Sequence, residues 1–243
     1  MSRSECKRGL GLLISFLLLF TLIGPSLAIE THNPAEKPYV IVEEIRPGGI
    51  CASPNSDNGA SNLHSWKIAS TLTYKINSDS IKGLDKDQTI LAIQRAANAW
   101  DGNTAAILFS YGGSTTAKPG TRDGLNTVSF GGAPFGSIAV AYIWASNGVV
   151  QEVDMVLANG FKWAIGIIEN PNITLDDCTG VDDRMDVQDI ATHEFGHWVG
   201  VAHTSDNSAN NAQTMFPFGS YKELFKQSLA NGDKEGLKQK YGP

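Results

Sequence analysis

The chain has 243 residues, of which 42% are hydrophobic and 18% charged, and its formal net charge is −6. This length suits one domain with a buried core. An acidic chain lacks the basic surface of proteins that bind nucleic acid or anionic membranes, so we expect neither as a partner.

Residues 1–28 have the three parts of a secretory signal peptide. Basic residues come first, an apolar run extends from Leu10 to Ile23, and Ser26-Leu27-Ala28 offers small residues for cleavage. An uncleaved anchor is the alternative, but the run is shorter than the ~20 residues that a bilayer span needs. We predict cleavage after Ala28 and secretion. The leader removes three basic residues and one acidic residue, which leaves a net charge of −8 and no membrane contact.

Residues 29–65 mix Pro, Gly, Asn and Ser with one short apolar run, Val40-Ile41-Val42. This composition predicts a loosely structured arm or a short propiece. The remaining residues, 66–243, are expected to form one α+β domain.

The domain begins with a strand at 72–76, where apolar and polar residues alternate. A helix follows from the cap Asp85, with Gln88 three residues on, to Gly102. Four more strands are predicted from apolar runs at 106–111, 126–130, 138–144 and 150–157. Asp186 is predicted to cap a second long helix, and a terminal helix is expected near 233–240.

Residues 193–203 read H-E-x-x-H-x-x-G-x-x-H. On a helix, His193 and His197 project from one face, and Gly200 allows the sharp turn that brings His203 back as a third ligand. Three nitrogen ligands leave zinc an open position, which is the catalytic arrangement. Glu194 is then placed to act as general base.

Met215 follows His203 by twelve residues, within Gln213-Thr214-Met215-Phe216-Pro217. A lone methionine is often plain core filling. Its position after the third histidine instead indicates the methionine turn that lies beneath the metal in metzincins.

These residues resemble a matrixin-type metzincin, the family of secreted zinc endopeptidases that includes the matrix metalloproteinases. The likeness spans roughly residues 66–243, from Trp66 to Tyr241-Gly242-Pro243. It implies a twisted, mostly parallel five-stranded sheet with an antiparallel edge strand, an active-site helix and a C-terminal helix. We expect a monomer that acts on protein or peptide substrates.

The resemblance also implies where a substrate binds. An extended peptide is expected to pair with the edge strand, formed by Ile138, Ala139, Val140, Ala141 and Tyr142. The specificity pocket is expected between Thr204 and the segment from Met215 through Phe216 and Pro217 to Phe218.

The chain departs from the matrix metalloproteinases at other metal sites. Val140 and Val156 stand where the ligands of their structural zinc are expected, so we predict one zinc per chain. Calcium is possible but unsupported, because its candidate ligands are more typical of solvated loop carboxylates. These candidates are Asp154, Asp176, Asp177, Asp182 and Asp183.

Two cysteines survive in the mature chain, Cys51 and Cys178. In an oxidising compartment such a pair favours a disulfide. Alternatively, Cys51 caps the zinc in a latent form, as the propeptide cysteine of the family does, although the flanking Pro-Arg-Cys-Gly motif is absent. Asn172 lies in a glycosylation triplet that is meaningful only in a eukaryotic source.

The sequence therefore predicts a secreted, single-zinc endopeptidase of extracellular proteins. The alternative is a protease-derived binding or adhesion protein that keeps the fold without turnover, because fold alone does not establish function.

Overall fold

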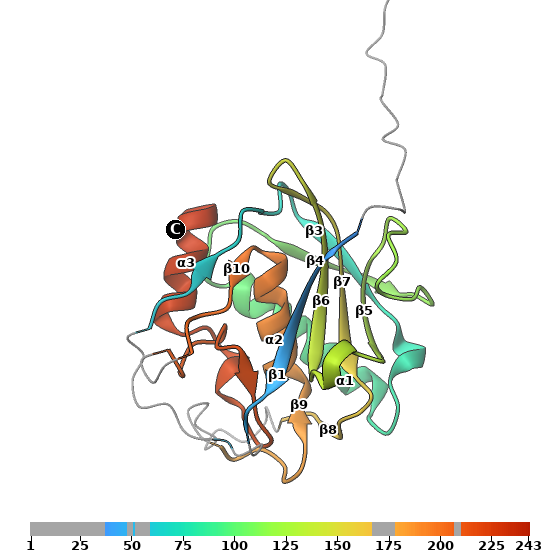
Figure 1. Cartoon of the computed structure of the whole chain (residues 1–243). Coiled ribbons are helices and arrows are strands. Elements are labelled where there is room, and N and C mark those ends of the chain that lie inside the picture. Colours follow the sequence, from blue (N-terminus) through green and yellow to red (C-terminus); the bar gives the residue numbers. More distant parts are fainter. Residues whose placement is uncertain (1–36, 48–50, 52–58, 167–177, 207–209) are drawn as a thin grey trace, which may run out of the picture. The chain divides into compact units, whose positions relative to one another are not determined.

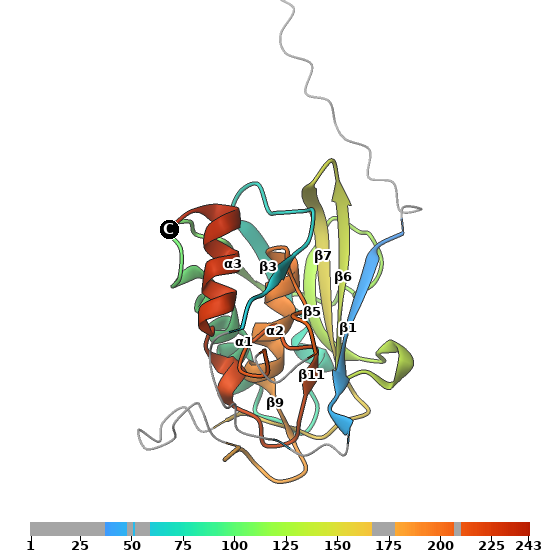
Figure 2. The same ribbon diagram turned by 60° about the vertical axis from the view of Figure 1, so that its left-hand side comes forward.

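The computed structural model describes residues 37–47, 51, 59–166, 178–206 and 210–243. Seven strands form the main sheet, and helices α1 and α2 pack against one of its faces (Figures 1 and 2). The strands of this sheet are β1 (Tyr39–Ile45), β3 (Leu72–Ile76), β4 (Phe109–Ser114), β5 (Asn126–Gly131), β6 (Ala139–Ser146), β7 (Val149–Ala158) and β11 (Phe218–Gly219).

The order across the sheet is β11-β1-β6-β7-β5-β3-β4. Strands β7, β5, β3 and β4 run parallel to one another, whereas β6 runs antiparallel to β7. This confirms the mostly parallel five-stranded sheet with an antiparallel strand. Two further ladders are short, and they pair β2 (Asn62–Leu63) with β10 (Val201–Ala202) and β8 (Trp163–Ala164) with β9 (Met185–Asp186).

The three helices are α1 (Lys86–Asp101), α2 (Val187–Trp198) and α3 (Asn231–Tyr241). Both predicted caps are confirmed: the side chain of Asp85 accepts the N–H of Gln88, and that of Asp186 accepts the N–H of Asp189. Every residue of α2 is buried, as expected for a helix at the centre of a domain.

An aromatic cluster holds α2 between α1 and the sheet. The rings of Phe195 and Trp198 on α2 contact those of Tyr74 on β3 and Phe109 on β4. The indole of Trp100 on α1 also donates to the carbonyl of Thr192, at 2.8 Å. These contacts fix the helix that carries the H-E-x-x-H residues.

Several element boundaries differ from the sequence prediction, and two of the shifted starts have a clear cause. Strand β4 starts at Phe109 instead of 106, because the carboxylate of Asp101 accepts the N–H groups of Leu108 and Phe109 and ties them to the end of α1. Helix α3 starts at Asn231 instead of 233, because Asp233 accepts the N–H of Ala230 and caps the first turn.

The largest difference lies in the N-terminal arm, which contributes a strand to the main sheet. Residues Tyr39 to Glu43 pair antiparallel with β6, and Glu44 and Ile45 pair parallel with β11. Strand β6 therefore has a neighbour on both sides, whereas the sequence predicted a free edge. The run of β-branched residues favours a strand, but its partners are too distant in sequence to be predicted from local pattern.

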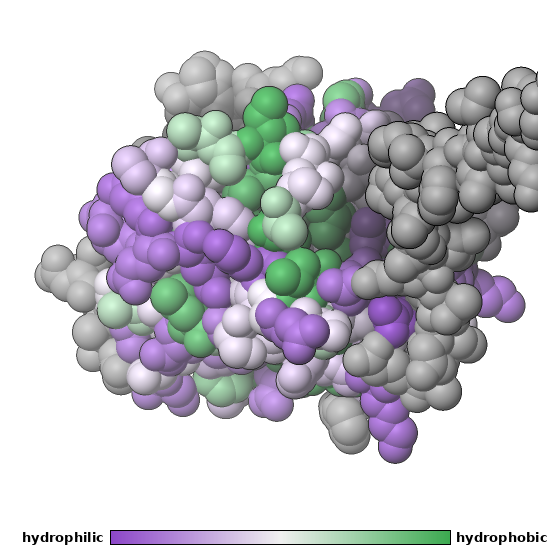
Figure 3. Space-filling view, turned by 90° about the horizontal axis from the view of Figure 1, so that it is seen from above, coloured by the Kyte–Doolittle hydropathy of each residue, from purple (hydrophilic) through white to green (hydrophobic). Residues whose placement is uncertain are grey.

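The start of β1 is open to solvent. Tyr39 and Val40 retain 53% and 46% of their accessible surface. The face seen in Figure 3 carries a narrow band of apolar side chains flanked by polar ones. Among the described residues, no helix has the length and apolar character needed to cross a membrane.

Candidate metal centre and active site

The turn after α2 brings the three motif histidines together. Gly200 has φ +83°, which glycine adopts without strain. A Cβ at this position would lie 2.1 Å from the carbonyl oxygen of Trp66, so a larger residue does not fit. The chain then reverses through β10 and returns His203 to the face of α2.

The Nε2 atoms of His193, His197 and His203 form a nearly equilateral triangle. The His193–His197 distance is 3.2 Å, and both distances to His203 are 3.1 Å. A tetrahedral zinc ion bound at ~2.0–2.1 Å needs ligand nitrogens roughly 3.3 Å apart. The donor set and its spacing therefore fit zinc, with one coordination position left open.

Backbone carbonyls orient two of these imidazoles. The Nδ1 of His193 donates to the carbonyl of Thr214 at 2.7 Å, and the Nδ1 of His197 donates to that of Val201 at 3.0 Å. Because a carbonyl only accepts, each Nδ1 carries the proton and each Nε2 keeps its lone pair for a metal.

Burial keeps the histidines neutral. It lowers the pKa of His193 and His197 well below the usual range, and the charge of Lys226 acts in the same direction. The pKa of His203 falls to about 4, first through burial and then through the charge of Lys226. Neutral imidazole is the form that binds zinc.

Glu194 lies beside the histidines as a fully buried carboxyl group. Within the described residues, neither of its oxygens has a hydrogen-bond partner, although buried polar groups are normally paired. Burial, and secondarily the charge of Glu43, raises its pKa well above the usual range. A carboxyl group with raised pKa and free lone pairs is suited to accept and return a proton.

The methionine turn lies directly beneath α2. Met215 is fully buried, and a Cβ at Gly196 would lie 2.2 Å from its Sδ. The buried carboxylate of Asp233 on α3 accepts the N–H groups of Thr214 and Met215, at 2.6 and 3.3 Å. The turn is thus attached both to the metal-binding helix and to the C-terminal helix.

The model of the matrixin family matches residues 65–242. The chain belongs to the matrixin family.

Several curated proteins are similar to this matrixin. Matrix metalloproteinase-16 of Homo sapiens is 28% identical over 212 residues, which cover 79% of this chain and 32% of that protein. Matrix metalloproteinase-20 of Homo sapiens is 26% identical over 185 residues, covering 73% and 32%. Neutrophil collagenase of Homo sapiens is 40% identical over 53 residues, covering 22% and 10%. The chain spans about a third of the length of the first two.

The expected specificity segment of the matrixin adjoins the histidines. The N–H of Thr204 donates to the carbonyl of Met215 at 2.9 Å, which joins the third ligand to the methionine turn. The Phe216 carbonyl accepts from Lys226, and the Pro217 carbonyl accepts from the N–H of Glu44 in β1. This segment therefore contacts a strand of the chain's own arm.

Sequence reasoning missed three residues around the metal centre: Glu43, His64 and Lys226. The ring of His64 stacks on Trp66 at 4.0 Å and approaches the ring of His197 edge-on at 5.7 Å. Burial and the charge of Lys240 lower the pKa of His64 to about 4. No motif marks these residues, because they reach the site through tertiary folding alone.

The structure joins Cys51 to Cys178. Cys51 and Cys178 form a disulfide with a Cα–Cα distance of 5.7 Å, as the compartment argument favoured. Because its sulfur is in the bridge, Cys51 has no free thiolate with which to cap a metal.

The other metal candidates differ in their surroundings. Val140 and Val156 face each other across β6 and β7 and offer no ligand atom. The carboxylate of Asp154 accepts the N–H groups of Gly120 and Thr127, and Asp182 pairs with Lys222. Asp183 adopts a positive φ of 54°. Asp176, Asp177 and Asn172 lie outside the described residues.

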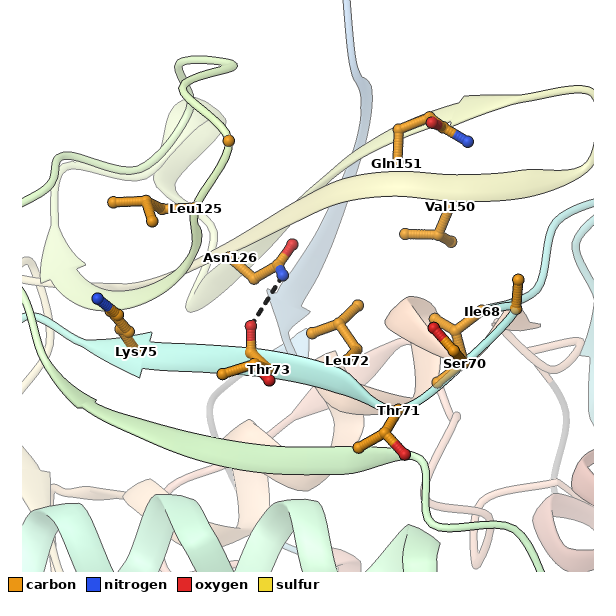
Figure 4. A pocket seen from close by; sticks show the side chains of 12 residues that line it. Ile68, Ser70, Thr71, Leu72, Thr73, Lys75, Leu125, Asn126, Val150 and Gln151 are labelled. Carbon is orange, nitrogen blue, oxygen red and sulfur yellow. Dashed lines mark hydrogen bonds between the residues drawn. The ribbon is translucent and has the colours of Figure 1, made fainter. Parts of the chain in front are cut away.

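A hollow lies beside β3 and the starts of β5 and β7 (Figure 4). Its lining is mainly aliphatic and hydroxyl side chains, with Lys75 as the one ionisable group. The amide of Asn126 donates across it to the carbonyl of Thr73 at 2.9 Å. It contains no acid–base pair that would support catalysis.

Proposed function

We propose that this matrixin is a secreted zinc-dependent endopeptidase that hydrolyses peptide bonds of extracellular proteins. The observation that carries the proposal is the triangle of three Nε2 atoms beside a buried carboxyl group without a hydrogen-bond partner. Residues 1–28 are proposed to serve as the secretion signal that is removed.

His193, His197 and His203 would hold the metal. When bound, zinc polarises the peptide carbonyl and makes water more acidic. Glu194 takes the proton of the attacking water and delivers it to the leaving amine. The complete burial of Glu194 strengthens its interactions with charge that develops in the reaction.

The alternative is a protein that binds peptides without cleaving them. The edge of β6 that is expected to pair with a substrate already carries β1, an arrangement that does not itself require turnover. Glu194 argues for turnover, because a binding protein has no need of a buried carboxyl group without a partner.

Peptide cleavage by the purified protein distinguishes the two functions. We expect one zinc per chain by elemental analysis and hydrolysis of a peptide library that stops when a chelator removes the metal. Peptide binding without hydrolysis by the zinc-loaded protein would favour the alternative, and two tightly bound zinc ions would contradict the single site.

A further inference from the structure

Strand β1 lies between two strands in the manner of an added peptide. Its residues Tyr39 to Glu43 pair antiparallel with β6, and the next two pair parallel with β11. The Glu43 carbonyl accepts the N–H of Ile138 at 2.8 Å, and the N–H of Glu44 donates to the Pro217 carbonyl at 3.2 Å. Main-chain bonds of this kind are how extended peptides join a sheet edge.

The one fully buried side chain of β1 carries an ionisable carboxyl group. Glu43 is fully buried, whereas the apolar residues of the strand are half-buried or exposed. Ile41 and Ile45 pack against the core, so burial of apolar surface holds the strand in part. The complete burial of Glu43 in this register needs a specific partner for its carboxylate.

That partner is Lys226, in the short helix η4 (Phe225–Gln227). Its Nζ contacts Oε1 of Glu43 at 2.6 Å and the carbonyls of Phe216 and Phe218 at 3.0 Å each. An ammonium group has three hydrogens, and these three bonds use all of them. Two hold the lysine to the methionine-turn segment, and the third points at the carboxylate.

The Glu43 carboxylate lies in a tightly packed pocket beside Gly219, with apolar side chains on one side and ionisable groups on another. A Cβ at Gly219 would lie 2.9 to 3.0 Å from Ile138, Ile190 and the carboxylate itself. The pocket adjoins the proposed reaction centre, because a carboxylate oxygen of Glu43, one of Glu194 and a ring nitrogen of His193 lie within 4.8 Å of one another.

We propose that β1 occupies the peptide-binding cleft in the manner of a substrate, and that Lys226 selects an acidic side chain at the position of Glu43. The cleft would thus take extended peptides with one glutamate or aspartate close to the cleaved bond, and β1 would compete with them. This inference rests on the endopeptidase function proposed above.

Lys226 also has a structural role that the test must separate from selection. Its Nζ lies 3.5 Å from a carboxylate oxygen of Glu223. The backbone N–H of Lys226 donates to the carboxylate of Asp189 on α2. A buried cation near these acids helps to neutralise them whether or not β1 is present. The experiment therefore needs variants on both sides of the pair.

The first measurement is cleavage-site profiling of the full chain on a peptide library. We expect acidic residues to be enriched at one fixed position near the cleaved bond. Lys226→Met should lower that enrichment at least tenfold. Lys222→Met, which changes a partly exposed lysine paired with Asp182, should preserve it. Cleavage without an acidic preference in the unaltered chain would overturn the inference and leave the endopeptidase function intact.

A second variant leaves Lys226 in place. Glu43→Lys puts two ammonium groups in one pocket and should release β1, so kcat/KM on library peptides should rise by about tenfold or more. Glu44→Lys, at an exposed position of the same strand, should leave kcat/KM nearly unchanged. Equal activity of Glu43→Lys and the unaltered chain would contradict competition by β1.

Peptide binding provides a readout that does not require hydrolysis. A labelled peptide with the sequence of residues 39–46 should bind the double variant Glu43→Lys, Glu194→Ala, as measured by fluorescence anisotropy. Replacing the glutamate that corresponds to Glu43 by glutamine should weaken binding at least tenfold. Equal binding of both peptides would refute selection by Lys226, even if no peptide were ever cleaved.

Discussion

Glu194 is the residue whose role depends most on its protonation state. It is buried, it has no hydrogen-bond partner among the described residues, and its pKa is raised. These properties suit proton transfer and do not require contact with the metal.

We predict that Glu194→Ala keeps the zinc content and the fold but lowers peptide hydrolysis by at least about a hundredfold, the usual share of a general acid–base group. Steady-state kinetics beside elemental analysis test this. Near-native turnover would show that another group moves the proton, and loss of zinc would show that Glu194 is a ligand.

His203 is predicted to behave differently, because its Nε2 completes the triangle of ligands. In His203→Ala, zinc content and activity should fall together, since metal binding requires all three imidazoles. Dialysis against a zinc buffer followed by elemental analysis measures the affinity. A variant that retained full zinc occupancy but lost activity would assign His203 to catalysis instead of binding.

At the level of single residues, the sequence motif predicted the metal ligands, the base and Met215, because their spacing follows from helix geometry and one glycine turn. The structure brings all of them together. Glu43 and Lys226 could not be predicted in the same way. They are 183 positions apart, and only the addition of β1 to the sheet makes them neighbours.

Helix α2 and the methionine turn approach each other closely enough to require glycine at their contact. A Cβ at Gly196 would lie 2.2 Å from the Sδ of Met215 and 2.6 Å from the ring of Trp100. Gly196→Ala should therefore lower the free energy of unfolding by about 1–3 kcal/mol through overpacking.

Thermal or urea unfolding of the zinc-loaded protein measures this change. Gly132→Ala is the matched control, because no atom lies within 4 Å of a Cβ at that position. Equal stability of the two variants would show that the methionine turn moves aside without cost.

The disulfide joins the segment after β1 to the segment before β9 and α2. It closes a sequence separation of 127 residues, and loss of a native bridge typically costs about 2–5 kcal/mol. The double variant Cys51→Ser, Cys178→Ser should be destabilised by this amount in chemical unfolding. Reduced, alkylated protein provides the comparison, and an unchanged unfolding midpoint in both would mean that the bridge does not restrain the unfolded chain.

Elements were predicted well where local pattern decides them. The caps Asp85 and Asp186 and the alternating strands are local signals, and the structure contains both helices and all five strands. The boundaries moved where a distant carboxylate, such as that of Asp101, binds the backbone. The arm was predicted as irregular because a strand that pairs only with remote strands leaves no local sign.

The stability of the whole molecule should depend on pH through its buried histidines. Burial lowers the pKa of His203 to about 4, from an ordinary value of about 6.5. A lowered pKa means that the folded state favours neutral imidazole, so this stabilisation is complete above the ordinary value and is lost as the pH falls toward 4.

We therefore predict that zinc release and loss of activity occur as the pH falls through about 6 to 4, because protons compete with the metal for the same nitrogens. A metal indicator read at each pH, beside circular dichroism, follows both events. The Glu194→Ala variant should release zinc over the same range. Full zinc retention and activity at pH 4 would contradict ligation by histidine.

The bridge from Cys51 also bears on how strongly β1 competes for its site. It fixes the chain only six residues after Ile45, so β1 behaves as a ligand on a short tether, with an effective concentration on the order of millimolar. A free peptide at micromolar concentration would have to bind about a thousandfold more tightly than the strand to displace it half of the time. Reduction of the bridge lengthens the tether and lowers that threshold, so the redox state of the surroundings would set how much substrate the cleft admits.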